Sequence, residues 1–331
     1  MNNTGFLGNA DIKTAVSRMI KNKKLTHSFV ITGDKGLGKK TAARYIGAAI
    51  LCENNSDGTP CMKCKSCKMI SHGGHPDFIE IKPSGKSGGY ILDKDLRPIV
   101  SEAYVKPNES EYKVVVISDM DATQQNSQNA LLKVVEEPPA HMVIIMTACS
   151  REYFLPTILS RVTHFKVYPL DKEELKNVVM GKCESFDGEK FEKAYEAMGG
   201  NVGKCVEFID GKQLSTAVSL TGKICSCIYN MDEYALMQAF YKAGEDKKLF
   251  VEVLMLLSNV LRDCAVKRSG GSSLTMLSCC KEETLQLALK ISPRKAILLY
   301  ELCEKYISRI NSNANIGLAH SAICAEIMEI I

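Results

Sequence analysis

The chain has 331 residues, of which 45% are hydrophobic and 24% are charged, and its formal net charge is +4. This length predicts about two domains, and the apolar content is sufficient for a packed core. A charge this small does not by itself indicate a nucleic-acid partner. No apolar run approaches the roughly 20 residues that a membrane-spanning helix needs, and the first residues lack a signal-peptide pattern. We therefore expect a cytoplasmic protein without a membrane anchor.

The first predicted elements are a β-branched strand at residues 27–33, a glycine loop and a helix over residues 39–52. The loop sequence, "GDKGLGKKT", is close to the phosphate-binding motif, in which Gly-Lys is followed by Ser or Thr. The candidate phosphate-binding residues are Gly33, Gly36, Gly38, Lys39, Lys40 and Thr41. Lys40 occupies the position of the hydroxyl that binds Mg²⁺, and the hydroxyl of Thr41 comes one residue late. The loop therefore predicts a degenerate ATP site that keeps phosphate contacts but lacks a metal ligand.

Four of the 14 cysteines follow this helix within a short segment, "CENNSDGTPCMKCKSC". They are Cys52, Cys61, Cys64 and Cys67. Two Cys-x2-Cys pairs sharing one cysteine predict a closed four-sulfur zinc site with a structural role. Iron–sulfur ligation is the alternative, but nothing redox-like accompanies the cluster. His72 or His75 could replace one of the cysteines. The other ten cysteines are scattered in mostly apolar patterns and predict small buried side chains in a reducing compartment.

An active ATPase needs acids directly after one of its apolar strands, and "KVVVISDMDA" is the segment where they are expected. Ser118 stands where an aspartate would hold Mg²⁺, and Asp119 stands where a glutamate would orient water. An Asp119–Asp121 metal pair remains an alternative interpretation. Together with Lys40, however, these substitutions favour a site that hydrolyses ATP poorly or not at all.

Further apolar strands are predicted at residues 76–83, 113–118, 141–148 and 163–169, and a helix over 121–137 is ended by Pro138 and Pro139. Apolar strands that alternate with helices predict an α/β domain with a parallel sheet covered on both faces. After residue 169 the strand signals stop. Helical patterns cover residues 170–183 and 190–210, and the rest of the chain is predicted to be helical.

Two further motifs, "NALLKVVEEPP" (129–139) and "LPTILSR" (155–161), together with the cysteine module after the phosphate-loop helix, resemble bacterial clamp-loader AAA+ proteins. The likeness covers most of residues 8–210. The last third resembles the family more weakly, through "LRDC" (261–264) and "NSNANIGL" (311–318). The resemblance implies an AAA+ domain with its zinc module over 1–166 (cysteines at 52–67), a three-helix lid over 167–211, and a helical collar over 212–331.

In that family, five subunits form an open ring that sets the sliding clamp on primed DNA, and each ATP lies at a subunit boundary. The resemblance implies that Ser160 and Arg161 form the Ser-Arg motif, with Arg161 acting as an arginine finger on a neighbour's ATP. It also implies gamma/tau and delta subunits as partners in a hetero-pentamer. In the lid, where family ATPases carry a sensor arginine, this chain has Gly203 followed by Lys204.

Three hypotheses about function follow. The favoured one is a clamp-loader subunit without intrinsic ATPase activity, which supplies its finger to a neighbour. The second is an ATP-hydrolysing motor subunit of the gamma/tau type in the same ring. The third, a zinc protein outside replication, is disfavoured because it does not account for the motifs at 129–139 and 155–161.

Overall fold

The computed structural model describes residues 6–85, 89–90, 92–123, 125–183, 186–270, 277–312 and 314–331. The chain forms two compact units, Met1–Val178 and Val179–Ile331. Within the described ranges, no helix is both long enough and apolar enough to cross a membrane.

The first unit is built on one five-stranded sheet in which all neighbouring strands are parallel. Its strands are β1 (Ser28–Thr32), β2 (Phe78–Ile81), β3 (Lys113–Ile117), β4 (Met142–Ala148) and β5 (Thr163–Lys166). The spatial order is β2-β3-β4-β1-β5. All five strands lie inside the segments that the sequence predicts, and the expectation of a parallel α/β sheet is confirmed.

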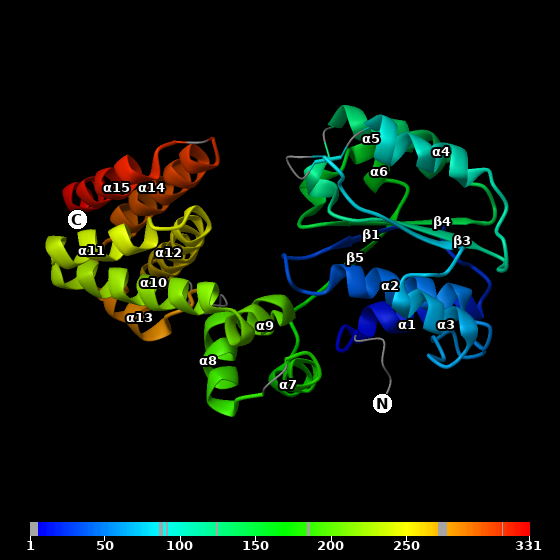
Figure 1. The fold of residues 1–331 in the computed structure, drawn as a ribbon, viewed down its shortest axis with the longest axis horizontal. Helices are drawn as coiled ribbons and strands as arrows, with labels where there is room; N and C mark the ends of the chain where they lie inside the picture. The colour runs from blue at the N-terminus through cyan, green and yellow to red at the C-terminus, as the bar shows by residue number, and fades with distance from the viewer. Residues whose placement is uncertain are drawn as a thin grey trace. The chain divides into compact units, whose positions relative to one another are not determined.

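Helices cover both faces of this sheet, as Figure 1 shows. The helices on one face are α1 (Ala10–Lys21), α2 (Lys39–Leu51) and α3 (Lys65–His72), and those on the other are α4 (Arg97–Ala103), α5 (Gln125–Glu136) and α6 (Pro156–Leu159). Alternate residues of a strand point to opposite faces. Accordingly, Phe29 and Ile31 of β1 belong to the core on the α1–α3 side, whereas Val30 belongs to the core under α4–α6. Strands that are buried on both faces explain the continuous apolar runs in the sequence.

The chain runs from β1 to β2 at the far edge of the sheet and then returns through β3 to β4, which lies next to β1. The helices that follow β1 cover one face of the sheet, and the helix between β4 and β5 covers the other. In open parallel sheets, ligands bind at such a point, outside the carboxyl ends of the strands. The glycine loop follows β1 at this edge, and Ser118 and Asp119 follow β3 at the same edge. The topology therefore brings together two segments that lie about 80 residues apart in the sequence.

The described residues of the second unit form helices and the turns that join them, with no strand. They are α8 (Gly188–Met198), α9 (Val202–Asp210), α10 (Lys212–Asn230), α11 (Glu233–Ala243), α12 (Lys247–Arg268), α13 (Lys281–Lys290), α14 (Pro293–Asn311) and α15 (Ile316–Ile330). Several begin at the side-chain caps that polar residues provide, for example Asp232 before α11 and Ser292 before α14. An apolar core runs through α10–α15. This unit confirms the expected all-helical C-terminal region.

The motif "LRDC" has a structural role in this unit. Asp263 is buried and its carboxylate accepts hydrogen bonds from the main-chain N–H groups of Leu277 (2.6 Å) and Ser278 (2.7 Å). These bonds fix the chain just ahead of α13. The other C-terminal motif, at 311–318, includes residue 313, which lies outside the described residues.

The expected lid region contains α7 (Lys172–Met180), α8 and α9. The boundary between the two compact units falls within α7 and not at residue 166 or 211. The division into AAA+ domain, lid and collar therefore remains a prediction from the family resemblance.

A buried carboxylate fastens the loop ahead of β3 to the start of β2. Asp77 is fully buried and accepts hydrogen bonds from the main-chain N–H groups of Asn108 (2.6 Å), Glu109 (2.9 Å) and Ser110 (2.9 Å). The side-chain amide of Asn108 donates a fourth, at 3.1 Å. Burial raises the pKa of Asp77, but these hydrogen bonds outweigh it, so the net effect is a lowered pKa.

We predict that Asp77→Asn destabilises the first unit by about 1–3 kcal/mol, because an amide nitrogen would replace one acceptor oxygen and face buried donors. This loss of unfolding free energy should have its full size near neutral pH. It should shrink as the pH falls below about 4, where the carboxyl of the unfolded chain is protonated and the native ionised form loses its advantage. Urea unfolding at several pH values measures this. Glu111→Gln, an exposed change in the same loop, is the control; equal effects of the two variants would contradict the prediction.

Candidate functional site

The loop after β1 has the backbone shape that its glycines permit. Gly33, Gly36 and Gly38 have φ angles of +149°, +94° and +95°, a region that other residues rarely adopt. At Gly33 the requirement is also steric, because an added Cβ would lie 2.8 Å from the carbonyl oxygen of Val167. The loop leads directly into the N-terminus of α2, so its N–H groups and the positive end of the helix dipole lie at the same place. This arrangement suits a phosphate group.

The phosphate-loop lysine is folded back onto its own loop. Lys39 is 7% exposed, and its Nζ donates to the carbonyl oxygens of Gly33 at 2.7 Å and Asp34 at 3.1 Å. In an active loop this ammonium meets the β- and γ-phosphate oxygens. Its present partners are neutral carbonyls, which an incoming phosphate could replace as the stronger, charged acceptor.

An ion pair joins the position of the metal-binding hydroxyl to the position that would orient water in an active site. Lys40 Nζ lies 2.6 Å from Asp119 Oδ2, and the two side chains are 45% and 39% exposed. In active P-loop ATPases, the loop hydroxyl and the acid at the strand end hold the metal between them. In this chain an ammonium group stands at the hydroxyl position and pairs with Asp119, while Ser118 stands at the position of the metal-binding acid. The hydroxyl of Thr41 lies near the loop, 3.9 Å from a Cβ added at Gly38, but one residue beyond the motif position.

The other predicted metal positions are also engaged. Ser118 is 1% exposed, and its carbonyl oxygen accepts a hydrogen bond from the hydroxyl of Tyr90. Asp119 has a φ of +58°, and its N–H donates to Thr147 Oγ1 at 3.1 Å. Asp121 Oδ1 accepts from the main-chain N–H of Cys149 at 3.0 Å. These contacts give Asp119 and Asp121 different partners, which does not favour the Asp119–Asp121 metal pair.

Sequence reasoning missed two residues of this site. It placed Cys149 among the scattered buried cysteines, but Cys149 is only half-buried, and its Sγ lies 3.9 Å from Lys39 Nζ. Burial raises the pKa of the Cys149 thiol, and the nearby Lys39 opposes that effect. Tyr90, which covers the end of β3, was also missed, because neither residue belongs to a motif with a known spacing. The remaining nine scattered cysteines are buried, as expected.

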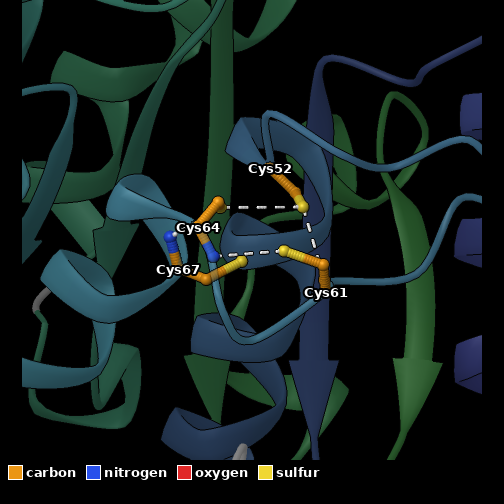
Figure 2. Close-up of side chains that lie close together, drawn as sticks. All are labelled: Cys52, Cys61, Cys64 and Cys67. Atoms are coloured by element: carbon orange, nitrogen blue, oxygen red, sulfur yellow. Dashed lines mark hydrogen bonds between the residues drawn. The ribbon is translucent and has the colours of Figure 1, made fainter.

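The four clustered cysteines converge on one point (Figure 2). Their sulfur atoms all lie within 4.8 Å of one another, and Cys52 Sγ and Cys64 Sγ are 3.9 Å apart. Four sulfurs at about 2.3 Å from a tetrahedral zinc stand roughly 3.8 Å apart, so the set fits one zinc ion. The ligands of an iron–sulfur cluster bind different irons and stand further apart, which favours a single ion. Neither His72 nor His75 belongs to the set.

Main-chain N–H groups point at these sulfurs. Cys52 Sγ accepts from Cys61 N at 3.3 Å, Cys61 Sγ from Cys64 N at 3.3 Å, and Cys64 Sγ from Cys67 N at 3.4 Å. A hydrogen bond from Lys63 N is the main cause that lowers the pKa of Cys61 to about 6. Burial raises the pKa values of Cys52 and Cys67. Zinc would therefore meet one thiolate ready at neutral pH and displace protons from the more buried thiols.

We predict that the native protein holds one zinc ion per chain, measurable by elemental analysis. If the ion contributes about 3 kcal/mol to the first unit, chelation or Cys64→Ser should lower its thermal midpoint by roughly 6–12 °C. Cys149→Ser, outside the cluster, should retain the metal and serves as the control. A native protein with no zinc, or with four clustered thiols that react freely with an alkylating reagent, would contradict this assignment.

Ser160 and Arg161 lie at the end of α6, on the protein surface. The guanidinium of Arg161 donates through Nη1 to Thr157 O at 3.0 Å and to Ser160 Oγ at 3.1 Å. Its Nη2 lies 3.3 Å from Glu136 Oε1 of α5. Ser160 Oγ in turn donates to Thr157 O at 3.0 Å. The arginine side chain is 43% exposed, so it remains available to another molecule.

Arg161 is far from the phosphate loop of its own chain. Thr163 of β5 is in register with Phe29 of β1, so Arg161 lies level with the start of β1, at the amino edge of the sheet. Gly33 follows β1 at the carboxyl edge. The separation is about six residues along the strand direction, which corresponds to roughly 20 Å. A side chain at this place therefore cannot act on a nucleotide bound in the loop of the same chain.

Comparison with known proteins agrees with this architecture. Residues 8–171 match the family model described as "DNA polymerase III, delta subunit". DNA polymerase III subunit gamma of Buchnera aphidicola subsp. Schizaphis graminum is 34% identical over 188 residues, 56% of this chain and 51% of that protein. Subunit tau/gamma of Haemophilus influenzae is 25% identical over 299 residues, 88% of this chain and 41% of that protein.

The chain spans about half the length, or less, of these relatives. Among solved structures, a gamma subunit-related protein of Thermotoga maritima is 17% identical, with 96% of this chain and 99% of that one covered and a TM-score of 0.44. The family match at residues 8–171 includes the glycine loop, the cysteine module and the motifs at 129–139 and 155–161. Residues 8–171 belong to the clamp-loader AAA+ family of DNA polymerase III subunits.

Proposed function

We propose that the chain is a delta-prime-like subunit of the DNA polymerase III clamp loader. It joins gamma/tau and delta subunits in a hetero-pentamer in the cytoplasm, and the complex sets the sliding clamp on primed DNA. In this proposal the chain does not hydrolyse ATP itself. Its catalytic contribution is Arg161, presented to the ATP of a neighbouring subunit.

The observation that carries the proposal is that the metal-binding positions hold Lys40 and Ser118, with Lys40 paired to Asp119. A hydrolytic site needs Mg²⁺ to neutralise charge on the β- and γ-phosphates. Here the loop offers no hydroxyl at the motif position, and Ser118 offers no carboxylate. The remaining acid, Asp119, is neutralised by Lys40 at 2.6 Å. Nucleotide could still be held by the loop N–H groups and Lys39, but without a protein-bound metal.

The position of Arg161 supports the other half of the proposal. A fixed planar guanidinium suits charge that develops on a transferring phosphoryl group. Arg161 is exposed, is held from two helices, and lies at the sheet edge opposite the loop of its own chain. These are the properties that a finger acting across a subunit boundary requires.

A motor subunit is the second candidate, because the curated relatives are named gamma and tau/gamma. That candidate requires metal-dependent turnover by the chain itself. The two candidates therefore differ in which residue of this chain the complex depends on: Arg161 in the first and Lys39 in the second.

We predict negligible ATP hydrolysis by the isolated chain, and nucleotide affinity that changes less than about twofold between Mg²⁺ and EDTA. Lys40→Ser restores the motif hydroxyl and releases Asp119, so it should make binding at least about fivefold tighter with Mg²⁺. Lys40→Gln, which removes the charge without adding the hydroxyl, is the matched control and should gain much less. Steady turnover by the unaltered chain, abolished by Lys39→Ala, would instead identify a motor subunit.

We predict that Arg161→Ala folds and assembles normally but slows ATP hydrolysis and clamp loading by the reconstituted complex. At the site that receives the finger, the loss should be on the order of 10³-fold or more. The total rate of ATP hydrolysis by the complex should fall by the fraction that this one site contributes. Lys39→Ala in this chain should have a much smaller effect. Full activity with Arg161→Ala, combined with failure of Lys39→Ala, would reverse the assignment.

A further inference from the structure

The two sequence motifs of the first unit meet at one ion pair. Glu136 is the last residue of α5, in the segment "NALLKVVEEPP", and Arg161 ends the segment "LPTILSR". Glu136 Oε1 and Arg161 Nη2 are 3.3 Å apart, and the side chains are 40% and 43% exposed. The proposed function accounts for Arg161 but assigns no role to Glu136.

The contacts of the guanidinium show what this pair does. Nη1 directs both of its hydrogens within α6, to Thr157 O and Ser160 Oγ, and Nη2 faces Glu136 of α5. A guanidinium has five N–H donors, of which one belongs to Nε and two to each Nη. Among the described residues, the hydrogen bonds of the guanidinium use only the two hydrogens of Nη1; the Nε–H and the Nη2 hydrogens are left for another acceptor, and Nη2 is held beside Glu136 by an ion pair. The guanidinium of Arg161 is thus held by residues of α5 and α6 while some of its N–H donors remain without an acceptor among the described residues.

We propose that Glu136 is a positioning residue for Arg161, which fixes the guanidinium in the orientation needed by the phosphate of a neighbouring subunit. This inference rests on the proposed function. A long arginine side chain has considerable rotamer freedom, and part of it must be lost when the group is aligned on a reacting phosphate. The Glu136 contact restricts the side chain before that event. Because the pair is exposed, it contributes little to the stability of the unit itself.

The test is the complex reconstituted with Glu136→Gln in this chain. We expect the kcat of ATP hydrolysis at the site that depends on Arg161 to fall about two- to fivefold, which is about 0.4–1 kcal/mol at 1.36 kcal/mol per tenfold. The KM for ATP should stay unchanged, because the contact acts on alignment and not on nucleotide binding. Glu137→Gln is the matched control, since Glu137 is exposed and belongs to no ion pair among the described residues. Its activity should be normal.

Two further measurements separate positioning from a structural role. First, Glu136→Gln should leave the thermal midpoint of the isolated chain unchanged. Second, in a background of Arg161→Ala, Glu136→Gln should have no additional effect on kcat, because the two residues act as one unit. A further fall in kcat when Glu136→Gln is added to Arg161→Ala would overturn the inference. So would a kcat for Glu136→Gln that equals the kcat for Glu137→Gln.

The outcomes also separate this inference from the proposal on which it rests. If Arg161→Ala leaves hydrolysis by the complex unchanged, both the proposed function and the role of Glu136 are wrong. If Arg161→Ala slows hydrolysis while Glu136→Gln does not, the finger assignment stands and the positioning role alone is wrong.

Discussion

The all-parallel pairing of the sheet is the constraint on which the rest of the first unit depends. Parallel strands place every carboxyl end at one edge and every amino end at the other. The glycine loop and the segment after β3 therefore meet at one edge, although they lie far apart in the sequence. Arg161, which precedes β5, lies at the opposite edge. The same geometry that brings the glycine loop and the segment after β3 together keeps Arg161 away from them and exposed at the surface.

Much of this could be predicted from the sequence because the signals were local. Strands buried on both faces appear as continuous apolar runs, and the Cys-x2-Cys spacing indicates convergent sulfurs without knowledge of the fold. The helices α1, α3 and α4 were not predicted as separate elements. α3 is only eight residues long and begins inside the cysteine segment, where turn-forming residues and ligand spacing dominate the pattern. Short helices like this form because neighbours hold them, and local sequence carries little of that information.

The sequence predicted which residues lie at the candidate site better than it predicted which of them contact one another. The motif template shows that Lys40 and Ser118 replace the expected hydroxyl and carboxylate ligands of Mg²⁺, but it does not show that Lys40 reaches Asp119, 79 positions away. The pairing depends on how α2 packs on the sheet, where its main strand contacts are with β1 and β4. One turn further along α2, Arg44 makes two hydrogen bonds to Glu80 of β2, at 2.5 and 2.8 Å. This partly buried pair fixes the helix over the strand ends and brings Lys40 within reach of Asp119. Tyr90 and Cys149 were missed for the same reason, since only the folded chain brings them to this edge.

The Lys40–Asp119 pair is too weak to be, by itself, the reason for the proposed lack of ATP hydrolysis. Exposed ion pairs contribute about 0–1 kcal/mol, and both of these side chains are well exposed to solvent. A bound metal with good ligands could displace such a contact. What the site lacks is the ligands: a hydroxyl at the position of Lys40 and a carboxylate at the position of Ser118. The ion pair satisfies the charge of Asp119 and leaves the glycine loop in its wrapped shape. Under the proposed function, a site without metal chemistry is compatible with an intact fold, and Arg161 keeps its exposed position at the opposite edge of the sheet.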